Sequence, residues 1–567
     1  MTNEFSTSFP ATTFTCRRHT RRNARRAGFD FRGVLAVALG VGVFATSGVQ
    51  ADPAEMIYAA SGHAGSPYSD VPGLSGSQFV NFGRGFRSSG SRWLFIPNIS
   101  NATGATDQLI FVGQGRTGAI AAQEGVTVVD DQGTLLNLSQ LALPRINAAG
   151  NWSMAFNPAA SSTTGLVVKK VNGVFSTVAR TGGPAPVLGG SSTFGNVFAW
   201  ASITDTNAVS FQANNLADAD NPFGTIGNFF DDGNQLLAQI NETVPGNQLG
   251  GLTNQLTALV TSTSVPPLAV SPNGAVRMYL GDMAAAPTGQ SRVLVRNGLV
   301  VLQTGSTLGN DTVTSIDEFW LEVNGDWFAR CTLTPIGGGG GTTSIIRNGS
   351  VVARIGQLIH PGAGENWASF VDYKGNNKGD WVITGTSNAA DNFANNIAVL
   401  NSSRVISRAG DGVALDPDGQ FNDNLYVHSF RDRCFVGDDG YFYVGARLKN
   451  SPTTTSSLTA NASLIRIRYE PQRCNAADIA NDQGTPLPGP ANVPNGGVNE
   501  GDYNCFFAAD GFFAQSALGP AAIGAFTDIA DDQGTALPPF GNPTGANNGV
   551  NEGDYNCFFN NFFIPCV

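Results

Sequence analysis

Two short stretches predict the fold: Asn324-Gly-Asp-Trp327-Phe-Ala and, after it, Ile345-Ile-Arg-Asn348-Gly349, which leads into the run Val351 to Arg354. The first reads as a turn followed by a strand, and the second as a strand that ends in an Asn-Gly turn. An Asn-Gly turn between apolar runs is the strongest short signal for a β-hairpin, because both turn residues must accept a positive φ angle. The stretches therefore predict an antiparallel meander.

The same phrase recurs along most of the chain. Seven strands begin after such a turn, at intervals of roughly 50 to 65 residues, and they contain Trp93, Trp152, Val209, Val276, Trp327, Trp381 and Tyr441. A lone meander of about four strands cannot bury both of its faces, whereas seven arranged around an axis bury each sheet against its neighbours. The sequence predicts an all-β fold, a seven-bladed β-propeller over residues 52–470.

The two ends of this region predict how the ring closes. The last repeat runs through 441–446 and 462–469 and then stops one strand short, while the missing phrase stands at Ile57 to Gly62. We expect residues 55–61 to pair with residues near 462–469, because a ring closed by both chain ends leaves no open sheet edge.

The composition agrees with many short strands and turns. The chain has 567 residues, of which 70 are glycine, 41% are hydrophobic and 13% are charged. Glycine at this level without a three-residue period belongs in turns. The formal net charge of −11 argues against a general nucleic-acid binder, which needs clustered Lys and Arg.

The phrase Val178-Ala-Arg-Thr-Gly-Gly-Pro-Ala-Pro186 carries a resemblance to a known group. Together with the aromatic strands after Asn-Gly or Gly-Asn turns, it resembles the secreted bacterial tandem-repeat proteins. The likeness covers most of residues 55–470. It implies a bacterial protein with a propeller-like scaffold, and it implies no activity.

The first 51 residues read as an export signal. Seven arginines lie between residues 17 and 32, and an apolar run from Val34 to Ala45 follows them. The run is shorter than the roughly 20 residues of a membrane-spanning helix, so we expect cleavage after Ala51 and no transmembrane anchor. An uncleaved anchor and a twin-arginine signal at Arg21-Arg22 are the alternatives. The mature chain would be secreted with 25 basic and 41 acidic side chains, a net charge of −16.

Residues 471–567 contain two copies of one acidic unit, each made of a first phrase Asp-Ile-Ala and a second phrase Gly-Val-Asn-Glu-Gly-Asp-Tyr-Asn. Calcium takes six to eight hard oxygens, often from a loop that ends where a helix starts. If the Pro-rich stretch between the phrases is an insertion, the candidate ligands are Asp478, Asp482, Asn499 and Asp502 in the first copy and Asp528, Asp532, Asn551 and Asp554 in the second. The alternative is two acidic turns that bind no metal.

These duplicated phrases resemble the GC-type dockerin domain that ends many secreted bacterial proteins. The resemblance implies calcium binding and noncovalent attachment to a cohesin-like partner or another surface scaffold. The insertion between Gly484 and Gly497 departs from an ordinary dockerin loop and leaves the number of calcium ligands open.

Six cysteines remain in the mature chain, and four of them lie in the C-terminal module. An exported protein can form disulfides, and four cysteines allow three pairings. The symmetry of the copies favours Cys505 with Cys557 and Cys474 with Cys566. Cys331 and Cys434 lie in blades that are not neighbours and are expected as separate buried thiols.

Residues for catalysis are scarce. The mature chain has three histidines, His63, His360 and His428, which we expect as polar loop residues. Gly113-Gln-Gly115-Arg-Thr-Gly118 matches a dinucleotide fingerprint, but too few residues follow it for the phosphate-binding helix, so a hairpin turn is the simpler interpretation. The long, partly acidic loops between blades are the default ligand surface.

Two functions fit these observations. The first is a secreted, noncatalytic binding protein whose propeller displays a ligand face for a glycan or a protein and whose C-terminal module attaches it to a scaffold. The alternative is a secreted carbohydrate-active hydrolase or lyase with the same tail. Two carboxylates, or a carboxylate and a histidine, facing each other in the central channel would favour the enzyme.

Overall fold

The computed structural model describes residues 54–564 with internal gaps. The gaps are 88–90, 103–105, 134, 139–140, 142–143, 157–164, 189–191, 196, 219–220, 241–255, 260–267, 284–288, 417–421, 432–433, 470–474, 488–496, 538–542 and 544. The expected export signal lies outside the described residues. The described chain forms a propeller over residues 54–469 and a small helical module over residues 475–564.

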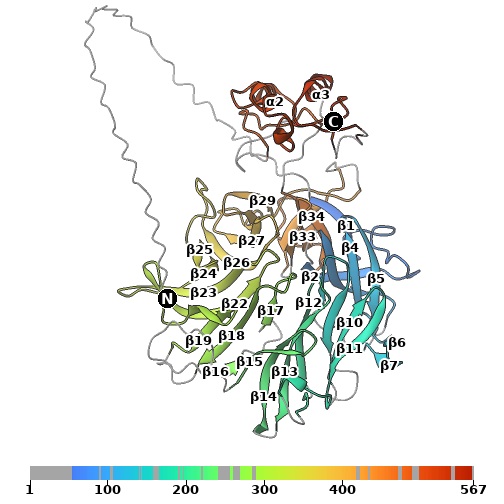
Figure 1. The fold of residues 1–567 in the computed structure, drawn as a ribbon, viewed down its shortest axis with the longest axis vertical. Coiled ribbons are helices and arrows are strands. Elements are labelled where there is room, and N and C mark those ends of the chain that lie inside the picture. Colours follow the sequence, from blue (N-terminus) through green and yellow to red (C-terminus); the bar gives the residue numbers. More distant parts are fainter. Residues whose placement is uncertain are drawn as a thin grey trace, which may run out of the picture. The chain divides into compact units, whose positions relative to one another are not determined.

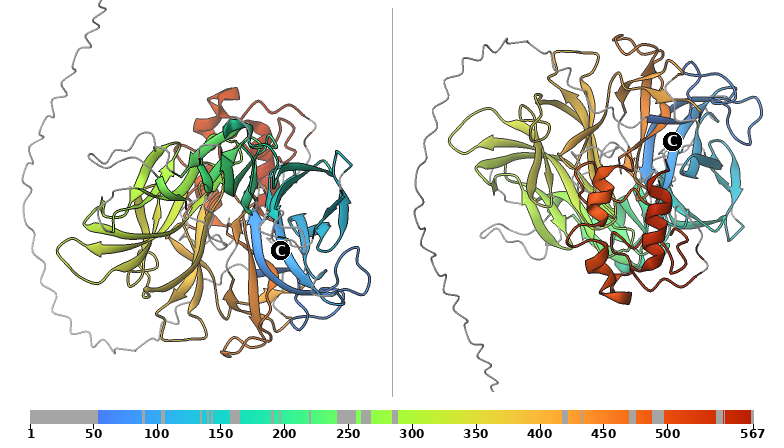
Figure 2. Two further views of the ribbon diagram at one scale, coloured as in Figure 1. Left: turned by 90° about the horizontal axis from the view of Figure 1, so that it is seen from below. Right: turned by 90° about the horizontal axis from the view of Figure 1, so that it is seen from above.

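The propeller has seven sheets among the described residues (Figure 1), and Figure 2 shows them arranged around a common centre. Sheet 1 contains β2 (Phe79–Arg87), β3 (Arg92–Ile99), β4 (Leu109–Gln114) and β5 (Thr117–Gln123); sheet 2 contains β8 (Arg145–Ile146), β9 (Trp152–Phe156), β10 (Leu166–Val171) and β11 (Val174–Arg180); sheet 3 contains β12 (Val197–Ile203), β13 (Val209–Asp218), β14 (Asn221–Phe230) and β15 (Gln235–Gln239).

The next three sheets follow in chain order. Sheet 4 contains β16 (Leu256–Leu259), β17 (Leu268–Val270), β18 (Arg277–Met283), β19 (Arg292–Arg296) and β20 (Leu299–Gln303); sheet 5 contains β21 (Thr307–Leu308), β22 (Asp311–Leu321), β23 (Trp327–Pro335), β24 (Thr342–Arg347) and β25 (Ser350–Arg354); sheet 6 contains β26 (Trp367–Gly375), β27 (Trp381–Ser387), β28 (Asn396–Leu400) and β29 (Arg404–Arg408).

Sheet 7 joins the two ends of the propeller region. It contains β30 (Val413–Ala414), β1 (Ala54–Tyr58), β34 (Ser463–Arg468), β33 (Tyr441–Lys449), β31 (Tyr426–Phe430) and β32 (Phe435–Val436), and a separate hairpin is formed by β6 (Thr127–Val129) and β7 (Leu135–Asn137). Strand β1 runs antiparallel to β34, with Glu55 opposite Arg466 and Met56 opposite Ile465. The predicted closure of the ring is therefore confirmed.

Apolar clusters hold the sheets together around the whole ring. Seven clusters of described residues each span two consecutive sheets, and they include Leu94 with Met154 (sheets 1 and 2), Val167 with Phe211 (2 and 3), Phe230 with Tyr279 (3 and 4), Leu280 with Ala329 (4 and 5), Phe328 with Ile383 (5 and 6), Val382 with Val444 (6 and 7) and Tyr443 with Phe79 (7 and 1). The alternating strands thus bury both faces of each sheet, which one meander alone could not do.

The turn asparagines have a second role, which holds both for the Asn-Gly turns at Asn297 and Asn348 and for the Asn-Ser turn at Asn401. In sheets 4, 5 and 6 the turn asparagine has a φ angle of +49° to +51°, and its backbone N–H donates to the carbonyl of the first residue of the preceding strand, which is its neighbour in the sheet. Its side-chain Oδ1 accepts the N–H of that same residue, and the pairs are Asn297 with Arg277, Asn348 with Trp327 and Asn401 with Trp381. One residue therefore fixes both the turn and the start of the strand.

The C-terminal module contains α1 (Glu500–Phe506), α2 (Phe512–Ser516) and α3 (Glu552–Phe562), with a 3-10 turn η2 (Gly519–Ala522); a further 3-10 turn, η1 (Pro186–Leu188), belongs to the propeller. The module has its own apolar cluster, which includes Phe506, Phe512 and Phe558. Among the residues that the structure describes, no helix is long and apolar enough to cross a bilayer.

Candidate functional site

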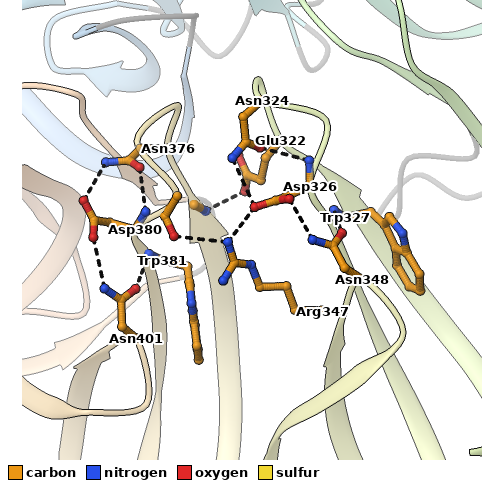
Figure 3. Close-up of polar contacts among 12 residues, drawn as sticks. Glu322, Asn324, Asp326, Trp327, Arg347, Asn348, Asn376, Asp380, Trp381 and Asn401 are labelled. Carbon is orange, nitrogen blue, oxygen red and sulfur yellow. Dashed lines mark hydrogen bonds and ion pairs between the residues drawn. The ribbon is translucent and has the colours of Figure 1, made fainter. Parts of the chain in front are cut away.

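Polar side chains at the starts of the repeats hold strands and sheets together, as Figure 3 shows for sheets 5 and 6. Asp326 accepts hydrogen bonds from Asn348 Nδ2 at 2.7 Å and from Arg347 at 2.5 Å, and Arg347 also donates to the Gly379 carbonyl of the next sheet at 3.1 Å. Burial raises the pKa of Asp326, but the hydrogen bonds from Arg347, Asn348 and Asn324 outweigh it and hold the pKa below its usual value. These repeated side chains are therefore structural.

In the acidic segments that the sequence favoured as a ligand surface, two carboxylates already form ion pairs with arginines of the same protein. Asp311 forms an ion pair with Arg354 at 2.5 Å, and Glu365 forms one with Arg408 at 3.2 Å. Each arginine ends the outer strand of its sheet, so the ion pair ties that strand to the start of β22 in sheet 5 and to the loop before β26 in sheet 6. A ligand would have to break these contacts to reach the two carboxylates.

A cavity of about 60 Å³ lies where the first strands of several sheets converge. Residues of β8, β12, β17, β22, β26 and β32, from sheets 2 to 7, line it, together with short segments next to these strands. The side chains that give it chemical character are Arg145, Trp200, Trp320, Glu322, Lys374 and Phe435. This central cavity combines aromatic walls with a few charged groups, as ligand sites do, but its volume is well below the roughly 300–1,000 Å³ of most such sites, so a larger ligand would enter it only in part.

A larger, open hollow of about 900 Å³ lies beside the loop that contains Ser66 to Gly76. Its lining residues are mainly glycines and small polar residues, with no aromatic ring and no basic side chain among them. A hollow of this kind offers little to orient a ligand, so the central cavity is the stronger candidate.

Arg145 lies between two tryptophans in the central cavity. The carbon at the centre of its guanidinium group is 5.3 Å from the centroid of the Trp200 ring and 5.2 Å from that of Trp320. Trp200 has a φ angle of +54°, and the pairing of β12 with β13 is irregular between Ala199 and Ser202. A bulky residue in the left-handed region costs roughly 1–2 kcal/mol, and such strain is concentrated at functional sites.

Lys374 and Asp372 form a buried ion pair on β26, next to this cavity. Lys374 is 3% exposed and its Nζ lies 3.9 Å from the centroid of the Trp320 ring. The Asp372 carboxylate accepts from Lys374 and from the Cys434 N–H at 3.0 Å, and the Cys434 thiol lies 3.4 Å from it. Burial, reinforced by Asp372, raises the pKa of Cys434, so this thiol stays protonated and is a poor nucleophile.

The three histidines have separate surroundings. His360 is only half-buried, and its Nδ1 lies 2.9 Å from the Pro361 carbonyl, while His428 Nε2 lies 3.0 Å from the Thr455 carbonyl. His63 differs from the sequence expectation of a polar loop residue. It is 6% exposed and contacts Ser463 and Leu448 of sheet 7, because the segment after β1 folds back onto that sheet.

In the first copy of the acidic unit, hydrogen bonds join Asp482, Asn499 and Asp502, three of the four predicted calcium ligands, but the described residues contain no group of three or more His, Cys, Asp or Glu side chains that could hold a metal ion. Asn499 is the N-cap of α1, and its Nδ2 donates to Asp482 Oδ1 at 2.7 Å. Asp502 is fully buried, and its carboxylate accepts three backbone N–H groups, from Ile479, Ala480 and Asn499. Burial raises the pKa of Asp502, with the neighbouring Asp478 adding to this, and the backbone hydrogen bonds partly offset it.

The second copy repeats this arrangement. Asp554 accepts the N–H groups of Ile529, Ala530 and Asn551, and Asn551 Nδ2 donates to Asp532 Oδ1 at 2.6 Å. Asp528 accepts the Gly524 N–H at 2.6 Å. Asp502 and Asp554 therefore tie the first phrase of each unit to the helix that follows, a role that the Asn-x-x-Asp spacing of a capping box could have indicated.

Three of the described cysteines are separate thiols. Cys331, Cys434 and Cys557 are free and buried, which confirms the expectation for Cys331 and Cys434. Because Cys557 is a free thiol, the predicted bridge between Cys505 and Cys557 is not formed; both side chains are used in the apolar cluster of the module. Cys474 and Cys566 lie outside the described residues.

The predicted hairpin turn at Gly113 to Gly118 is confirmed. Gly113 lies opposite Gly118 and Gln114 opposite Thr117 in the β4–β5 hairpin. Trp93 packs so closely here that a Cβ atom on Gly113 would lie 2.1 Å from its ring. The glycines therefore serve the packing of sheet 1, and the nucleotide interpretation has no helix to support it.

Solved structures align with the chain at low sequence identity. The β-propeller domain of the Trilobed protease from Pyrococcus furiosus aligns with a TM-score of 0.33 and 8% identity, over 67% of this chain and 98% of that chain. An ulvan lyase of polysaccharide lyase family PL25 aligns with a TM-score of 0.31 and 10% identity, over 74% of this chain and 94% of that chain. The acylaminoacyl peptidase from Pyrococcus horikoshii aligns with a TM-score of 0.32 and 8% identity, over 68% of this chain and 50% of that chain.

Likenesses this distant carry no argument about function. No protein-family model and no curated protein sequence matches the chain. The function has to be argued from the sites themselves.

Proposed function

We propose that the protein is a secreted, noncatalytic binding protein. Its propeller holds a ligand at the central cavity, and its C-terminal module attaches it to a scaffold or a cell-surface partner. The observation that carries the first half is the lining of the cavity, where two tryptophans, Arg145 and Lys374 converge from four sheets. Few convergent polar groups on aromatic walls are typical of a site that binds and orients a small molecule.

The lining favours binding over hydrolysis. Among the described residues that line the cavity, Glu322 is the one carboxylate, and no histidine is present. The Glu322 Oε1 already accepts the Gly375 N–H at 2.6 Å, which joins sheet 5 to sheet 6. Hydrolysis of a glycoside by two side chains needs a second carboxylate across the cleft, and the nearby Asp372 is held by Lys374 and Cys434.

A glycan array with the labelled mature chain tests the binding role. We expect retained, saturable binding of a subset of glycans, and the bound glycan should be recovered unchanged after prolonged incubation. Shortened or unsaturated saccharides in the eluate would instead support the hydrolase or lyase. A variant with Trp320→Ala should lose binding, whereas Tyr426→Ala, which changes an aromatic of the same propeller outside the cavity, should retain it.

The attachment role rests on the resemblance to dockerins and on the surface of the module. Tyr503, Phe513, Tyr555 and Phe563 are among its exposed aromatic residues, and Phe563, just after the end of α3, is 78% exposed. Tyr503 of α1 and Tyr555 of α3 occupy equivalent positions in the two copies. Aromatic side chains are enriched at protein interfaces, so these residues suit a protein partner such as a cohesin-like scaffold.

Calcium binding by the module remains part of this proposal. The side-chain oxygens are of the kind that calcium takes, but Asp502 and Asp554 do not fit as ligands, because their oxygens already accept three N–H groups each. Calcium would therefore take Asp478 and Asp482 in the first copy. In the second copy it would take Asp528 and Asp532 only by displacing the hydrogen bonds that Gly524 and Asn547 donate to Asp528 and that Asn548 and Asn551 donate to Asp532.

Calorimetric titration of the mature chain with calcium chloride tests this part. We expect binding in the micromolar to millimolar range, weakened about tenfold or more by Asp482→Asn or Asp532→Asn. Glu500→Gln is the matched control, since it removes a neighbouring acid of the same helix start that is outside the proposed ligand set. Absence of any binding at millimolar calcium would limit the module to metal-free attachment.

A further inference from the structure

We propose that the C-terminal module binds a basic protein partner through an aromatic face, with arginine side chains of the partner lying over its rings. This inference rests on the proposed attachment role, for which it names the chemistry of the partner. The aromatic face contains rings of α1, of the residue that caps α1, of α2 and of α3: Tyr503, Phe507, Phe513, Tyr555 and Phe559.

The rings of the aromatic face form one continuous surface. Phe507 lies at its centre, and its ring centroid is 4.9 Å from that of Tyr503, 5.9 Å from Phe513, 6.5 Å from Tyr555 and 6.0 Å from Phe559. Both tyrosines are exposed, and Phe513 is 67% exposed. Single exposed apolar side chains are ordinary on a protein surface, whereas a contiguous apolar patch marks an interaction site.

The core of the module does not explain why the two tyrosines are present. Tyr503 in the first copy of the acidic unit corresponds to Tyr555 in the second. Three residues after each tyrosine comes a fully buried phenylalanine, Phe506 or Phe558, and the rings of these two stack with their centroids 3.9 Å apart. The apolar cluster of the module is built around these phenylalanines and does not include the tyrosines. Both copies therefore place a tyrosine on the surface in addition to what packing needs.

The charge around the aromatic face favours a basic partner. Residues 475–567 contain ten aspartates and glutamates and no lysine, arginine or histidine. An exposed glutamate, Glu500 or Glu552, stands three residues before each tyrosine, a spacing that makes the two side chains neighbours on a helix. A second copy of the module, or an anionic lipid surface, would bring like charges together, so a basic protein is the complementary occupant.

The propeller of the same protein shows how aromatic rings take such cations. The central guanidinium carbon of Arg466 lies 4.0 Å from the centroid of the Tyr441 ring, and that of Arg277 lies 4.5 Å from the centroid of Phe230. Residues 475–567 have no basic side chain of their own that could do the same. Arginine from a partner suits these rings best, because its planar group stacks on an aromatic face and pairs with a neighbouring carboxylate at the same time.

Fluorescence anisotropy of a labelled eight-residue peptide of alternating arginine and leucine, titrated with the mature chain, tests the proposal. A peptide of alternating glutamate and leucine is the control for charge, and we expect it not to bind. We expect saturable binding of the arginine peptide, weakened about tenfold or more by the double variant Tyr503→Ser/Tyr555→Ser and about threefold by Glu500→Gln/Glu552→Gln. Tyr68→Ser, which removes an exposed tyrosine of the propeller, should leave the affinity unchanged.

The outcomes separate this inference from the attachment role, which retention of the labelled mature chain on washed cells that produce it measures directly. Equal binding of the two peptides, or binding of the arginine peptide that the tyrosine variant does not weaken, would overturn the inference. If the chain is then still retained on the cells, attachment stands and only the chemistry of the partner is wrong. If the peptides behave as expected but the chain is not retained, the attachment role fails and recognition of a basic partner stands. If the tyrosine variant does not fold, the glutamate variant and the two peptides decide.

Discussion

Lowering the pH from 7 to 4 is expected to reduce the free energy of unfolding of the propeller by about 3 kcal/mol more in the wild-type chain than in a His63→Gln variant. His63 lies where the two ends of the propeller region meet. Its Nδ1 is 2.7 Å from Ser463 Oγ, which also accepts the Ala60 N–H at 2.7 Å, and its Nε2 accepts the Leu448 N–H at 3.3 Å. The His63 side chain therefore links the segment after β1 to residues about 400 positions later in the sequence.

The sign of the effect follows from the protonation state of His63. Nε2 must keep its lone pair to accept from Leu448, so the folded protein holds the neutral ring with the proton on Nδ1. Burial accordingly lowers the pKa of His63 from near 6.5 to about 4. Above pH 6.5 the ring is neutral in both states; below it the unfolded chain gains a proton that the folded chain does not, so stability is lost as the pH falls toward 4.

Urea unfolding at several pH values, followed by tryptophan fluorescence, measures this difference. All seven tryptophans lie between Trp93 and Trp381, so the signal reports the propeller and not the C-terminal module. Glutamine offers one donor and one acceptor without titrating, so His63→Gln keeps the two contacts and leaves every other titratable group in place. If the free energy of unfolding depended on pH identically in the two proteins, the protonation of His63 would not contribute to the stability of the closed propeller.

The repeats made the ring predictable from the sequence. Asn348-Gly349 and its counterparts indicate hairpins because their backbone conformations are rare for other residues, and that signal is local. The closing strand was predictable for a similar reason, since its phrase is absent from the last repeat and present at Ile57 to Gly62. Local signals repeated seven times were sufficient for the architecture.

The central cavity was not predictable in this way. Arg145, Trp200 and Trp320 are each ordinary residues of a strand or its end, and they meet only because the inner strands of different sheets converge. The positive φ angle of Trp200 has no sequence signature. The burial of His63 could not be predicted from the sequence either, because it depends on the positions of Leu448 and Ser463. Contacts between residues far apart in the sequence need the register of the whole ring.

Replacing Gly445 by alanine is expected to destabilise the propeller by about 3 kcal/mol, because it disturbs the contact between sheets 7 and 1. Gly445 lies on β33, where an added Cβ atom would be 2.2 Å from the carbonyl oxygen of Phe82 on β2. A backbone oxygen cannot move aside as a side chain can, and the Phe82 N–H is itself bound to the Ala462 carbonyl at 2.7 Å. The strain would therefore have to separate the two sheets.

Gly364→Ala is the matched control for this substitution. An added Cβ at Gly364 meets no atom within 4 Å, and its backbone conformation is one that alanine adopts. Its free energy of unfolding, measured with urea, should stay within about 0.5 kcal/mol of the wild-type value, whereas that of Gly445→Ala should fall by about 3 kcal/mol. An unchanged midpoint for Gly445→Ala would mean that sheets 7 and 1 can separate at little cost. Closure would then depend on the β1–β34 pairing and His63 rather than on close packing, because these are among the other contacts that join the chain ends.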